Sequence, residues 1–181
     1  MKGAVMDEFQ LVSGCLQNDR GCQKALYERF APKMLAVCMR YSASKSEAED
    51  VMMEGFFKVF TSLKNFSFQS SLEVWVRSVM VHCAINNYNK NKRVWFTETI
   101  DNLSESDEPL IWSPLPDSIS TSEVMTAIQK MPSYLQVVLN MVAFDGYSYD
   151  EVSLMLGISQ VTVRTRFFRA KKWLQNYICD L

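Results

Sequence analysis

The segment Ser148-Tyr-Asp-Glu-Val-Ser-Leu-Met-Leu-Gly-Ile-Ser-Gln-Val-Thr-Val-Arg-Thr-Arg-Phe-Phe-Arg169 decides the fold of the C-terminal part of the chain. Ser148 and Glu151 have the spacing of a capping box, and Gly157 suits the end of the short helix that follows. Ser159 is a favourable N-cap for a second helix. A short helix, a glycine turn and a longer helix with apolar residues at the corner are typical of a helix-turn-helix.

The second helix of this segment has two distinct sides. Its apolar stripe, expected to face the core, is Val163, Phe167, Ala170, Leu174 and Ile178. The opposite side carries Val161, Arg164, Thr165, Phe168, Arg169 and Lys172. Cations and short polar side chains suit the major groove of DNA. The alternative is a solvated basic face, against which Phe168 counts, because an aromatic ring on a solvent side needs a partner. Arg166 lies nearer the core edge, where we expect a local ion pair.

Helical periodicity also covers most of the remaining chain. In the N-terminal half it predicts helices over residues 7–16, 21–41, 44–63 and 70–93, with a kink or break at Pro32. Ser44 and Glu47 form a second capping box, and Ser70 or Ser71 is expected to cap the fourth helix. In the C-terminal half it predicts helices over residues 122–130, 134–144, 149–156 and 160–178.

Residues 94–121 interrupt this pattern. They contain three prolines, six acidic residues, no basic residue and many serines, a composition typical of a flexible linker. We therefore predict an all-α protein of two small helical domains, residues 1–93 and 122–181, joined by an acidic flexible linker at 94–121. The C-terminal domain is the helix-turn-helix.

The net charge of −1 hides an uneven distribution along the chain. Residues 1–93 carry +4, residues 94–121 carry −6 and residues 122–181 carry +1. Nucleic-acid binding depends on clustered Lys and Arg. The near-neutral total therefore does not exclude a nucleic-acid partner for either domain.

The composition excludes several classes of enzyme. Five cysteines without a C-x-x-C spacing suggest reduced, mostly buried thiols, and His82 is the single histidine. The glycines form no phosphate-binding loop. We expect no catalytic residue, no metal site, no cofactor and no small-molecule substrate. The N-terminus has no signal-peptide pattern and no apolar stretch is long enough to span a bilayer, so we expect no membrane insertion and a cytoplasmic location.

The helix predicted over residues 44–63 has an unusual exposed side. Its core stripe is Ala48, Met52, Gly55, Phe56, Val59 and Leu63. The opposite side carries Glu47, Asp50, Met53, Glu54, Phe57 and Thr61. An aromatic ring among carboxylates is typical of a protein interface with an acidic rim. The alternative is that Phe57 packs on another helix of its own domain.

The next helix and the loop before it carry groups suited to unpaired bases. We expect Val74, Val81, Ala84, Ile85 and Tyr88 on the core side, and Trp75, Val79, His82, Asn86, Lys90 and Arg93 on the other. Aromatic, imidazole, amide and cationic groups along one stripe suit stacked bases followed by phosphates. The loop from Lys64 to Ser71 has two aromatics and several polar side chains that suit a flipped base. The alternative is that Phe66, Phe68 and Trp75 are packing residues and His82 is an ordinary helix residue.

Together these segments resemble the extracytoplasmic-function sigma factors of bacterial RNA polymerase. Residues 47–60, Glu47-Ala-Glu-Asp-Val-Met-Met-Glu-Gly-Phe-Phe-Lys-Val-Phe60, followed by Asn65-Phe66 and Trp75, are similar to the family's core-binding and promoter-melting segment. Met131-Pro132, residues 144–152 and residues 156–171 are similar to its C-terminal helix-turn-helix. The two blocks occur in the family's order and spacing.

The resemblance implies a specificity subunit with no catalytic chemistry, whose partners are the polymerase core, promoter DNA and an anti-sigma factor. It assigns core binding to Glu47, Asp50, Met53, Glu54, Phe57, Lys58 and Thr61. It assigns minus-ten DNA to Phe66, Ser67, Phe68, Gln69, Ser70, Ser71, Trp75, His82, Asn86, Lys90 and Arg93. It assigns minus-thirty-five DNA to Gln160, Thr162, Arg164, Thr165, Phe168, Arg169 and Lys172. The acidic linker would then thread toward the polymerase's active-site and RNA-exit channels.

Three positions depart from the family's usual residues. Met53 stands where Gln is common, His82 where Asn is common, and Val161 where Gly is common. The residues themselves also permit two other functions. One is a stand-alone helix-turn-helix regulator with an N-terminal sensor or dimerisation domain. The other is a helical protein that binds polymerase or a regulator without contacting DNA.

Overall fold

The structure, a computed structural model, describes residues 6–92 and 119–179. All regular elements in those two ranges are helical, which confirms the all-α class. Arg93 and residues 94–118 of the predicted linker lie outside the described residues. The chain divides into two compact units, one of residues 1–39 and 44–84 and the other of residues 40–43 and 85–181.

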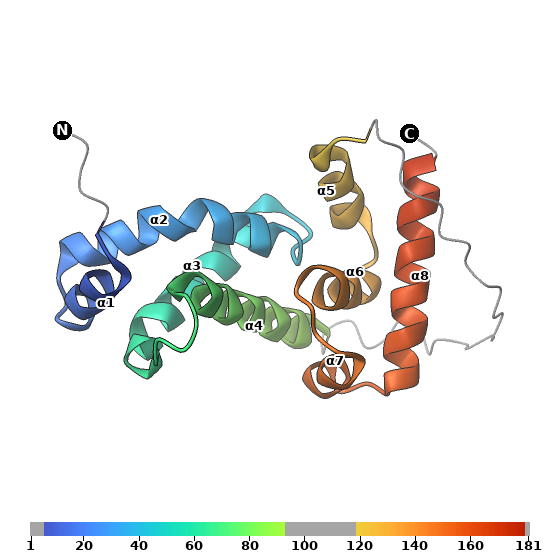
Figure 1. Cartoon of the computed structure of the whole chain (residues 1–181). Helices are drawn as coiled ribbons and strands as arrows, with labels where there is room; N and C mark the ends of the chain where they lie inside the picture. The colour runs from blue at the N-terminus through green and yellow to red at the C-terminus, as the bar shows by residue number, and fades with distance from the viewer. Residues whose placement is uncertain (1–5, 93–118, 180–181) are drawn as a thin grey trace. The chain divides into compact units, whose positions relative to one another are not determined.

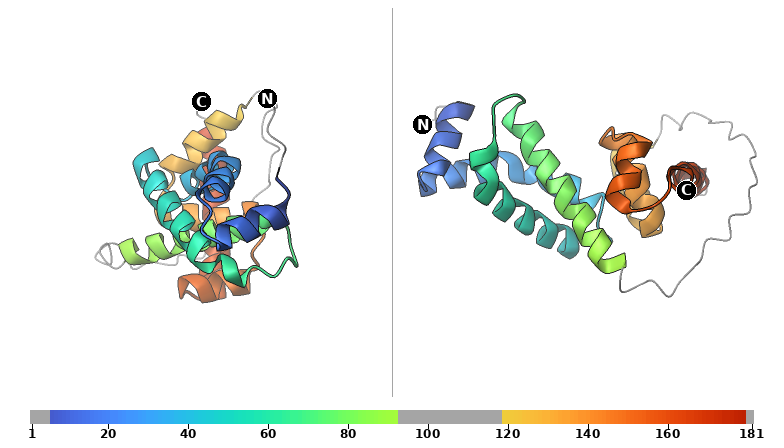
Figure 2. Two further views of the ribbon diagram at one scale, coloured as in Figure 1. Left: turned by 90° about the vertical axis from the view of Figure 1, so that its left-hand side faces the viewer. Right: turned by 90° about the horizontal axis from the view of Figure 1, so that it is seen from below.

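In its described residues, from 6 onward, the first unit contains four helices and one short 3-10 turn. They are α1 (Glu8–Leu16), α2 (Arg20–Met39), α3 (Lys45–Ser62), η1 (Leu63–Asn65) and the part of α4 (Leu72–Lys92) up to Ala84. Figure 1 shows α2 and α3 side by side, and both views of Figure 2 show α1 beside the start of α2. Their shared core includes the buried Leu26, Phe30, Met34, Phe56, Val59 and Met80.

Short polar side chains begin these helices where the sequence places them. Asp7 accepts a hydrogen bond from the Gln10 backbone N–H, and Ser44 accepts one from Glu47 N–H at 3.2 Å. Such caps satisfy backbone donors that a helix leaves unpaired at its start. Of the kink or break expected at Pro32, the break does not occur: α2 continues from Arg20 to Met39 through that residue.

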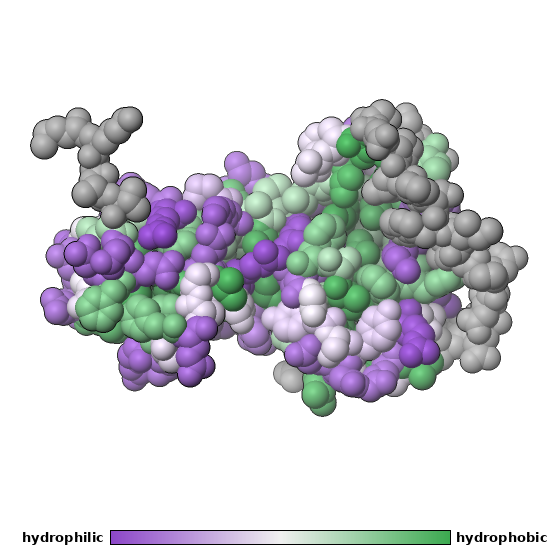
Figure 3. Space-filling view, viewed as in Figure 1, coloured by the Kyte–Doolittle hydropathy of each residue, from purple (hydrophilic) through white to green (hydrophobic). Residues whose placement is uncertain are grey.

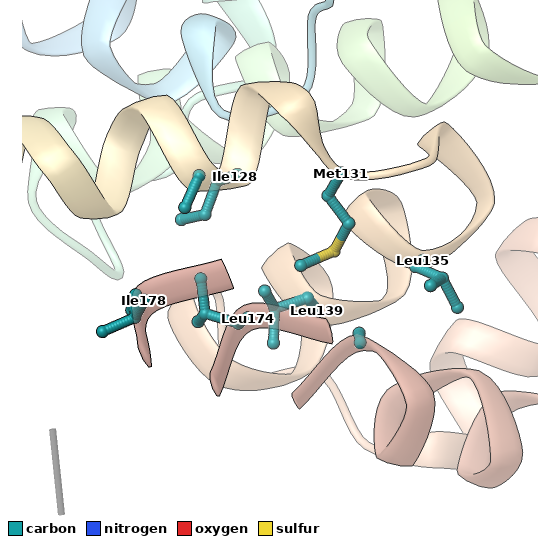
Figure 4. Packing of buried hydrophobic residues seen from close by; sticks show 8 residues of the cluster. Ile128, Met131, Leu135, Leu139, Leu174 and Ile178 are labelled. Carbon is teal, nitrogen blue, oxygen red and sulfur yellow. The ribbon is translucent and has the colours of Figure 1, made fainter. Parts of the chain in front are cut away.

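The second unit contains the C-terminal helices. They are α5 (Thr121–Lys130), α6 (Ser133–Leu139), the π-helical turn η2 (Asn140–Phe144), α7 (Tyr149–Leu156) and α8 (Gln160–Cys179). The helix predicted over residues 134–144 therefore ends in a π-helical turn. Figure 4 shows how α5, α6 and α8 bury a common cluster that includes Ile128, Met131, Leu135, Leu139, Leu174 and Ile178. This cluster fixes the side of α8 that faces the core.

Candidate nucleic-acid and protein-binding surfaces

The outer face of α3 is apolar at its centre. Every residue predicted for its core stripe is buried, and so is Val51. Met53 and Phe57, one turn apart on the opposite side, are 59% and 69% exposed. The alternative that Phe57 packs inside its own domain is therefore wrong. We call Met53 and Phe57, with the acidic residues beside them, the α3 face.

Polar groups border this apolar pair. Lys58 Nζ lies 3.0 Å from Glu54 Oε1, and this hydrogen bond is the largest cause of the raised pKa of Lys58. Thr61 Oγ1 donates to the Phe57 carbonyl at 2.9 Å. Glu54 and Lys58 therefore partly neutralise each other, while Asp50 is exposed. The α3 face keeps an acidic edge beside an apolar centre.

A groove between α2 and α3 extends the α3 face. It has a volume of about 540 Å³ and is lined by Tyr27, Ala31, Pro32, Leu35, Glu49, Met52 and Met53. No local sequence pattern predicts the α2 residues of this groove, because their place on the surface depends on how α2 packs on α3. Met53 belongs to both surfaces and joins them.

The loop between η1 and α4 contains packed and exposed residues. Phe66 is buried, with its ring centroid 5.5 Å from Trp75 and 4.6 Å from Phe68. Phe68 is 48% exposed and has a φ of +57°. Ser71 accepts from Val74 N–H at 3.3 Å and so caps α4. The packing alternative thus holds for Phe66 and partly for Trp75, while Ser67, Phe68, Gln69 and Ser70 remain available at the surface.

The outer stripe of α4 is only partly as predicted. His82, Asn86 and Lys90 are exposed and follow one another at a spacing of four residues. His82 Nδ1 lies 2.7 Å from the Ser78 carbonyl oxygen, which can only accept, so Nδ1 carries a proton and Nε2 faces outward. Val74, predicted on the core side, is 58% exposed, and that prediction is wrong. Val76 and Met80 are buried instead, and Met80 packs against Gly55 of α3.

The helix-turn-helix forms at the predicted residues. Ser148 and Glu151 make both hydrogen bonds of the capping box at the start of α7. Gly157 ends α7 in the left-handed conformation with a φ of 62°. Ser159 then accepts from Thr162 N–H at 3.1 Å, which caps α8. The corner is closed by the buried Val152, Leu156 and Val163.

The outer side of α8 is basic. Gln160, Val161, Arg164 and Lys172 are exposed, and Thr165, Phe168 and Arg169 are partly exposed. The helix carries five basic residues and no acidic one. Such a surface attracts phosphates whatever the net charge of the chain. We call these outward residues of α8 the α8 face.

Two residues of α8 have local roles. The Thr162 hydroxyl lies 2.8 Å from Ser159 Oγ and so takes part in the cap. The guanidinium of Arg166 lies over the ring of Tyr134, 5.4 Å from its centroid. Arg166 thus makes a cation–π contact with α6. Arg166 belongs to the packing of the second unit rather than to the α8 face.

Other kinds of site find no support in the described residues. Residues 6–92 and 119–179 hold no group of three or more His, Cys, Asp or Glu side chains placed to bind a metal. Cys15, Cys38 and Cys83 are buried, and burial raises the pKa of the Cys15 thiol to about 11. Among the helices described, none is long and apolar enough to cross a membrane.

Comparison with known proteins identifies two families along the chain. Residues 26–94 match "Sigma-70 region 2" and residues 121–174 match "Sigma-70, region 4". The chain is 29% identical over 182 residues to the RNA polymerase sigma-H factor of Pseudomonas aeruginosa, covering 95% of this chain and 94% of that protein. It is 28% identical over 174 residues to the ECF RNA polymerase sigma-E factor of Escherichia coli K12, covering 90% and 91%.

A solved structure supports the fold. The sigma factor RpoE of Bartonella quintana, in a co-crystal structure with the anti-sigma factor NepR, superposes with a TM-score of 0.51 at 18% identity. The match covers 85% of this chain and 94% of that one. At this level of identity the likeness concerns the fold.

Proposed function

The chain belongs to the extracytoplasmic-function sigma factors of bacterial RNA polymerase, and on that premise we propose how its residues divide the work of such a factor. The protein binds core polymerase, recognises promoter DNA and promotes transcription initiation. We assign core binding and minus-ten recognition to residues 1–93 and minus-thirty-five recognition to residues 122–181. The acidic residues 94–121 connect the two domains.

The observation that carries the core-binding assignment is the exposure of Phe57. A phenylalanine that is 69% exposed beside a 59% exposed methionine leaves apolar surface in water. A helical partner that covers both residues removes that surface, and exposed aromatic anchors of this kind dominate many interfaces. The α3 face therefore docks on the coiled coil of the polymerase's largest subunit.

The polar edge of the α3 face gives the docking its orientation. Asp50 and Glu47 supply negative charge on one side of Phe57, and Thr61 lies at the other. The groove between α2 and α3 accommodates a partner side chain next to Met53. Charge complementarity at the edge of an interface favours one register over others.

Minus-ten recognition is assigned to the exposed loop residues and the outer stripe of α4. Ser67, Gln69 and Ser70 present hydrogen-bonding groups on the surface. His82 presents Nε2, which in the neutral ring accepts a hydrogen bond from a base or sugar. Lys90 lies two turns further along α4 and suits a phosphate of the same strand.

Minus-thirty-five recognition is assigned to the α8 face. Arg164 and Arg169 are cations on the outer side of a helix-turn-helix recognition helix, the position from which arginine reaches guanine edges. Val161, 68% exposed, suits a thymine methyl group. Phe168 supplies a further apolar contact at the same surface.

The remaining assignments follow from the family. The protein acts as a DNA-binding initiation factor rather than an enzyme, and needs no cofactor or small-molecule substrate. It acts in the cytoplasm, where the polymerase works. RpoE of Bartonella quintana is described in complex with an anti-sigma factor, and we assign this chain a partner of the same kind.

Phe57→Ala tests the core-binding surface. Loss of an aromatic anchor weakens core association by about 2 kcal/mol, roughly thirtyfold. The matched control is Leu154→Ala, which removes an 84% exposed apolar side chain from α7 in the other unit. The measurement is titration of labelled full-length protein with core polymerase. Equal affinities of the Phe57→Ala variant and the wild type would remove the α3 face from the interface.

A second experiment separates a sigma factor from a stand-alone regulator. Core polymerase, the full-length protein and a library of promoter fragments are mixed, and run-off transcripts are sequenced. Transcripts that depend on the protein support the proposal. High-affinity duplex binding by the free protein without any transcript would favour the regulator.

A further inference from the structure

An exposed aromatic pair joins α1 to the loop before α4. Phe9 and Phe68 are 68% and 48% exposed, and their ring centroids are 5.8 Å apart with an interplanar angle of 39°. Phe68 in turn contacts Phe66, which contacts Trp75. Figure 3 shows the apolar surface over α1 and the adjoining part of the first unit. Four rings therefore lie in a row, in which Phe66 is buried, Trp75 is partly exposed, and Phe68 and Phe9 are exposed.

The two outer rings lie at the surface rather than in the core. Phe66 is 7% exposed and lies between Trp75 and Phe68, whereas Phe68 and Phe9 lie at the surface at 48% and 68% exposed. Phe68 also has a φ of +57°, a left-handed conformation that is unfavourable for a bulky side chain. Unfavourable backbone conformations of this kind often occur where a side chain contacts a ligand.

A second contact fixes α1 against the loop. Glu8 Oε2 accepts from Leu72 N–H at 3.1 Å, the first residue of α4, and Glu8 Oε1 lies 3.9 Å from Arg29 Nη2. Glu8 precedes Phe9 directly, so the cap that begins α4 also holds Phe9 next to Phe68. The family match begins at residue 26, and α1 precedes it.

The charges around the pair favour DNA over an acidic protein surface. Residues 63–71 carry Lys64 and no acidic residue, while Ser67 and Gln69 offer hydrogen-bonding groups. Two of the nearby carboxylates lie beside cations: Glu8 Oε1 is 3.9 Å from Arg29 Nη2, and Glu73 Oε2 is 2.7 Å from Lys33 Nζ. Exposed aromatic rings beside polar groups are the usual surface for unpaired bases.

We propose that Phe9 and Phe68 form a stacking surface for one unpaired base of the minus-ten promoter strand. The inference rests on the proposed role of the loop in minus-ten recognition and adds α1 to that site. The base stacks on the outer side of the ring pair, and Ser67 or Gln69 contacts its edge. Lys64 lies in the same loop and is exposed for a neighbouring phosphate.

The test measures binding of holoenzyme to a promoter whose minus-ten element is held unpaired as a bubble. The promoter sequence comes from the run-off transcription experiment described above. Phe9→Ala is expected to weaken binding to the bubble promoter about tenfold, the size of one base–aromatic stack. Phe9→Trp retains the affinity and Phe9→Leu does not, because stacking needs a ring. Leu16→Ala, which removes another exposed apolar side chain of α1, is the matched control and is expected to have no effect.

Removal of single bases identifies the stacked one. A series of bubble promoters is made, each with one base removed. Phe9→Ala is expected to weaken binding to all of them except the one that lacks the base stacked on Phe9. Equal affinity of Phe9→Ala and wild type on every bubble would overturn the inference. So would weakened binding to core polymerase with unchanged affinity for the bubble, which would mark the pair as a protein contact.

The same experiment separates this inference from the role of the loop. If Phe68→Ala and Gln69→Ala weaken bubble binding while Phe9→Ala does not, the loop recognises DNA and α1 does not. If none of the three has an effect, the minus-ten assignment of the loop fails as well. Thermal unfolding of each variant shows whether it is folded, and Phe9 is exposed enough for its removal to leave the core intact.

Discussion

At the scale of the residue, neighbouring cations on one helix have different surroundings. Arg166 and Arg169 are three positions apart on α8, yet the Arg166 guanidinium lies over Tyr134 and Arg169 lies on the outer side. The cation–π contact of Arg166 contributes to packing within the second unit. Arg169 belongs to the surface assigned to promoter DNA. The two arginines therefore provide a matched pair of substitutions.

Arg169→Ala is expected to weaken recognition of the minus-thirty-five element by about 1 to 3 kcal/mol, because it removes a contact to a base edge. Transcription that depends on this element is expected to fall accordingly. Arg166→Ala is expected to lower the melting temperature instead and to leave promoter preference unchanged. Run-off transcription from a set of minus-thirty-five variants measures the first effect, and thermal unfolding the second. Unchanged promoter preference in Arg169→Ala would make it part of an ordinary solvated face.

His82 offers a second residue-scale prediction. Because Nδ1 donates to the Ser78 carbonyl, the ring is held with Nε2 outward. His82→Ala is expected to weaken binding to the minus-ten bubble by about 1 kcal/mol, the net worth of one hydrogen bond. His82→Asn, which introduces the residue common in the family, is expected to retain binding but to change the preferred base. Binding to bubble promoters that vary at each minus-ten position measures both effects. A base preference of His82→Asn identical to that of wild type would contradict a contact between His82 and a base.

At the scale of the element, the first turn of α7 orients the helix-turn-helix. Ser148 accepts from Glu151 N–H at 3.3 Å, and Glu151 Oε2 accepts from Ser148 N–H at 2.7 Å. The Ser148 backbone N–H is the main cause of the lowered pKa of Glu151. The pKa of Glu151 is lower in the folded protein than in the unfolded chain. The ionised carboxylate therefore stabilises α7 fully at pH values above the unfolded pKa. The stabilisation disappears as the pH falls through the folded pKa.

Ser148→Ala is expected to destabilise the protein by about 1 kcal/mol through loss of this cap. Glu151→Gln is expected to remove the part of the acid sensitivity that the carboxylate contributes, so its stability falls less steeply below pH 5 than that of wild type. Urea unfolding monitored at several pH values measures both effects. Parallel pH profiles of Glu151→Gln and wild type would show that the cap does not depend on the carboxylate charge.

The close approach of α1 to α2 is a second feature at this scale. A Cβ atom at Gly14 would lie 2.2 Å from Cys22 Sγ and 2.9 Å from Cys22 Cβ. The Cβ atom of Cys22 is attached to the backbone, so it cannot move without displacing α2. Gly14 is therefore required by packing between helices rather than by its own backbone conformation.

Gly14→Ala is expected to destabilise the first unit by about 1 to 3 kcal/mol, since overpacking forces the helices apart. Adding Cys22→Gly removes both clashing atoms and is expected to recover part of the loss. Chemical denaturation of the single and double variants tests this coupling. A neutral Gly14→Ala would mean that α1 shifts freely, which would also weaken the placement of Phe9 beside Phe68.

At the scale of the whole molecule, charge is separated along the chain. The described part of α8 holds five basic residues, while residues 94–121 hold six acidic ones. An acidic segment in the same chain competes with DNA for basic surfaces. We therefore expect the free protein to bind promoter duplex weakly and the holoenzyme to bind it well.

Replacing the six acids of the linker by their amides tests this expectation; they are Glu98, Asp101, Glu105, Asp107, Glu108 and Asp117. Removing six negative charges moves the net charge from −1 to +5. The free variant is expected to bind duplex DNA more tightly than wild type at low salt, and the difference is expected to shrink as salt screens the charges. Fluorescence anisotropy across a salt series measures it, and equal affinity at low salt would refute the competition.

The sequence by itself determined where most helices begin and end, because caps and periodicity are local. Ser44, Ser148 and Gly157 begin or end helices through contacts within one turn, and the structure has these boundaries at the predicted residues. Helical periodicity also predicted which side of α3 is buried. Phe57 was ambiguous between interface and core, since an exposed aromatic residue has no local signature, and its exposure excludes the core.

Only the tertiary structure decided the contacts between helices. Val74 and Val76 on α4 are equally apolar, and the packing of α4 decides that Val76 is buried and Val74 exposed. The groove beside Met53 depends in the same way on α2. Phe9 and Phe68 are far apart in sequence, so no periodicity relates them. Periodicity fixes the angle between side chains on one helix, whereas the rotation and approach of two helices depend on how their side chains fit together.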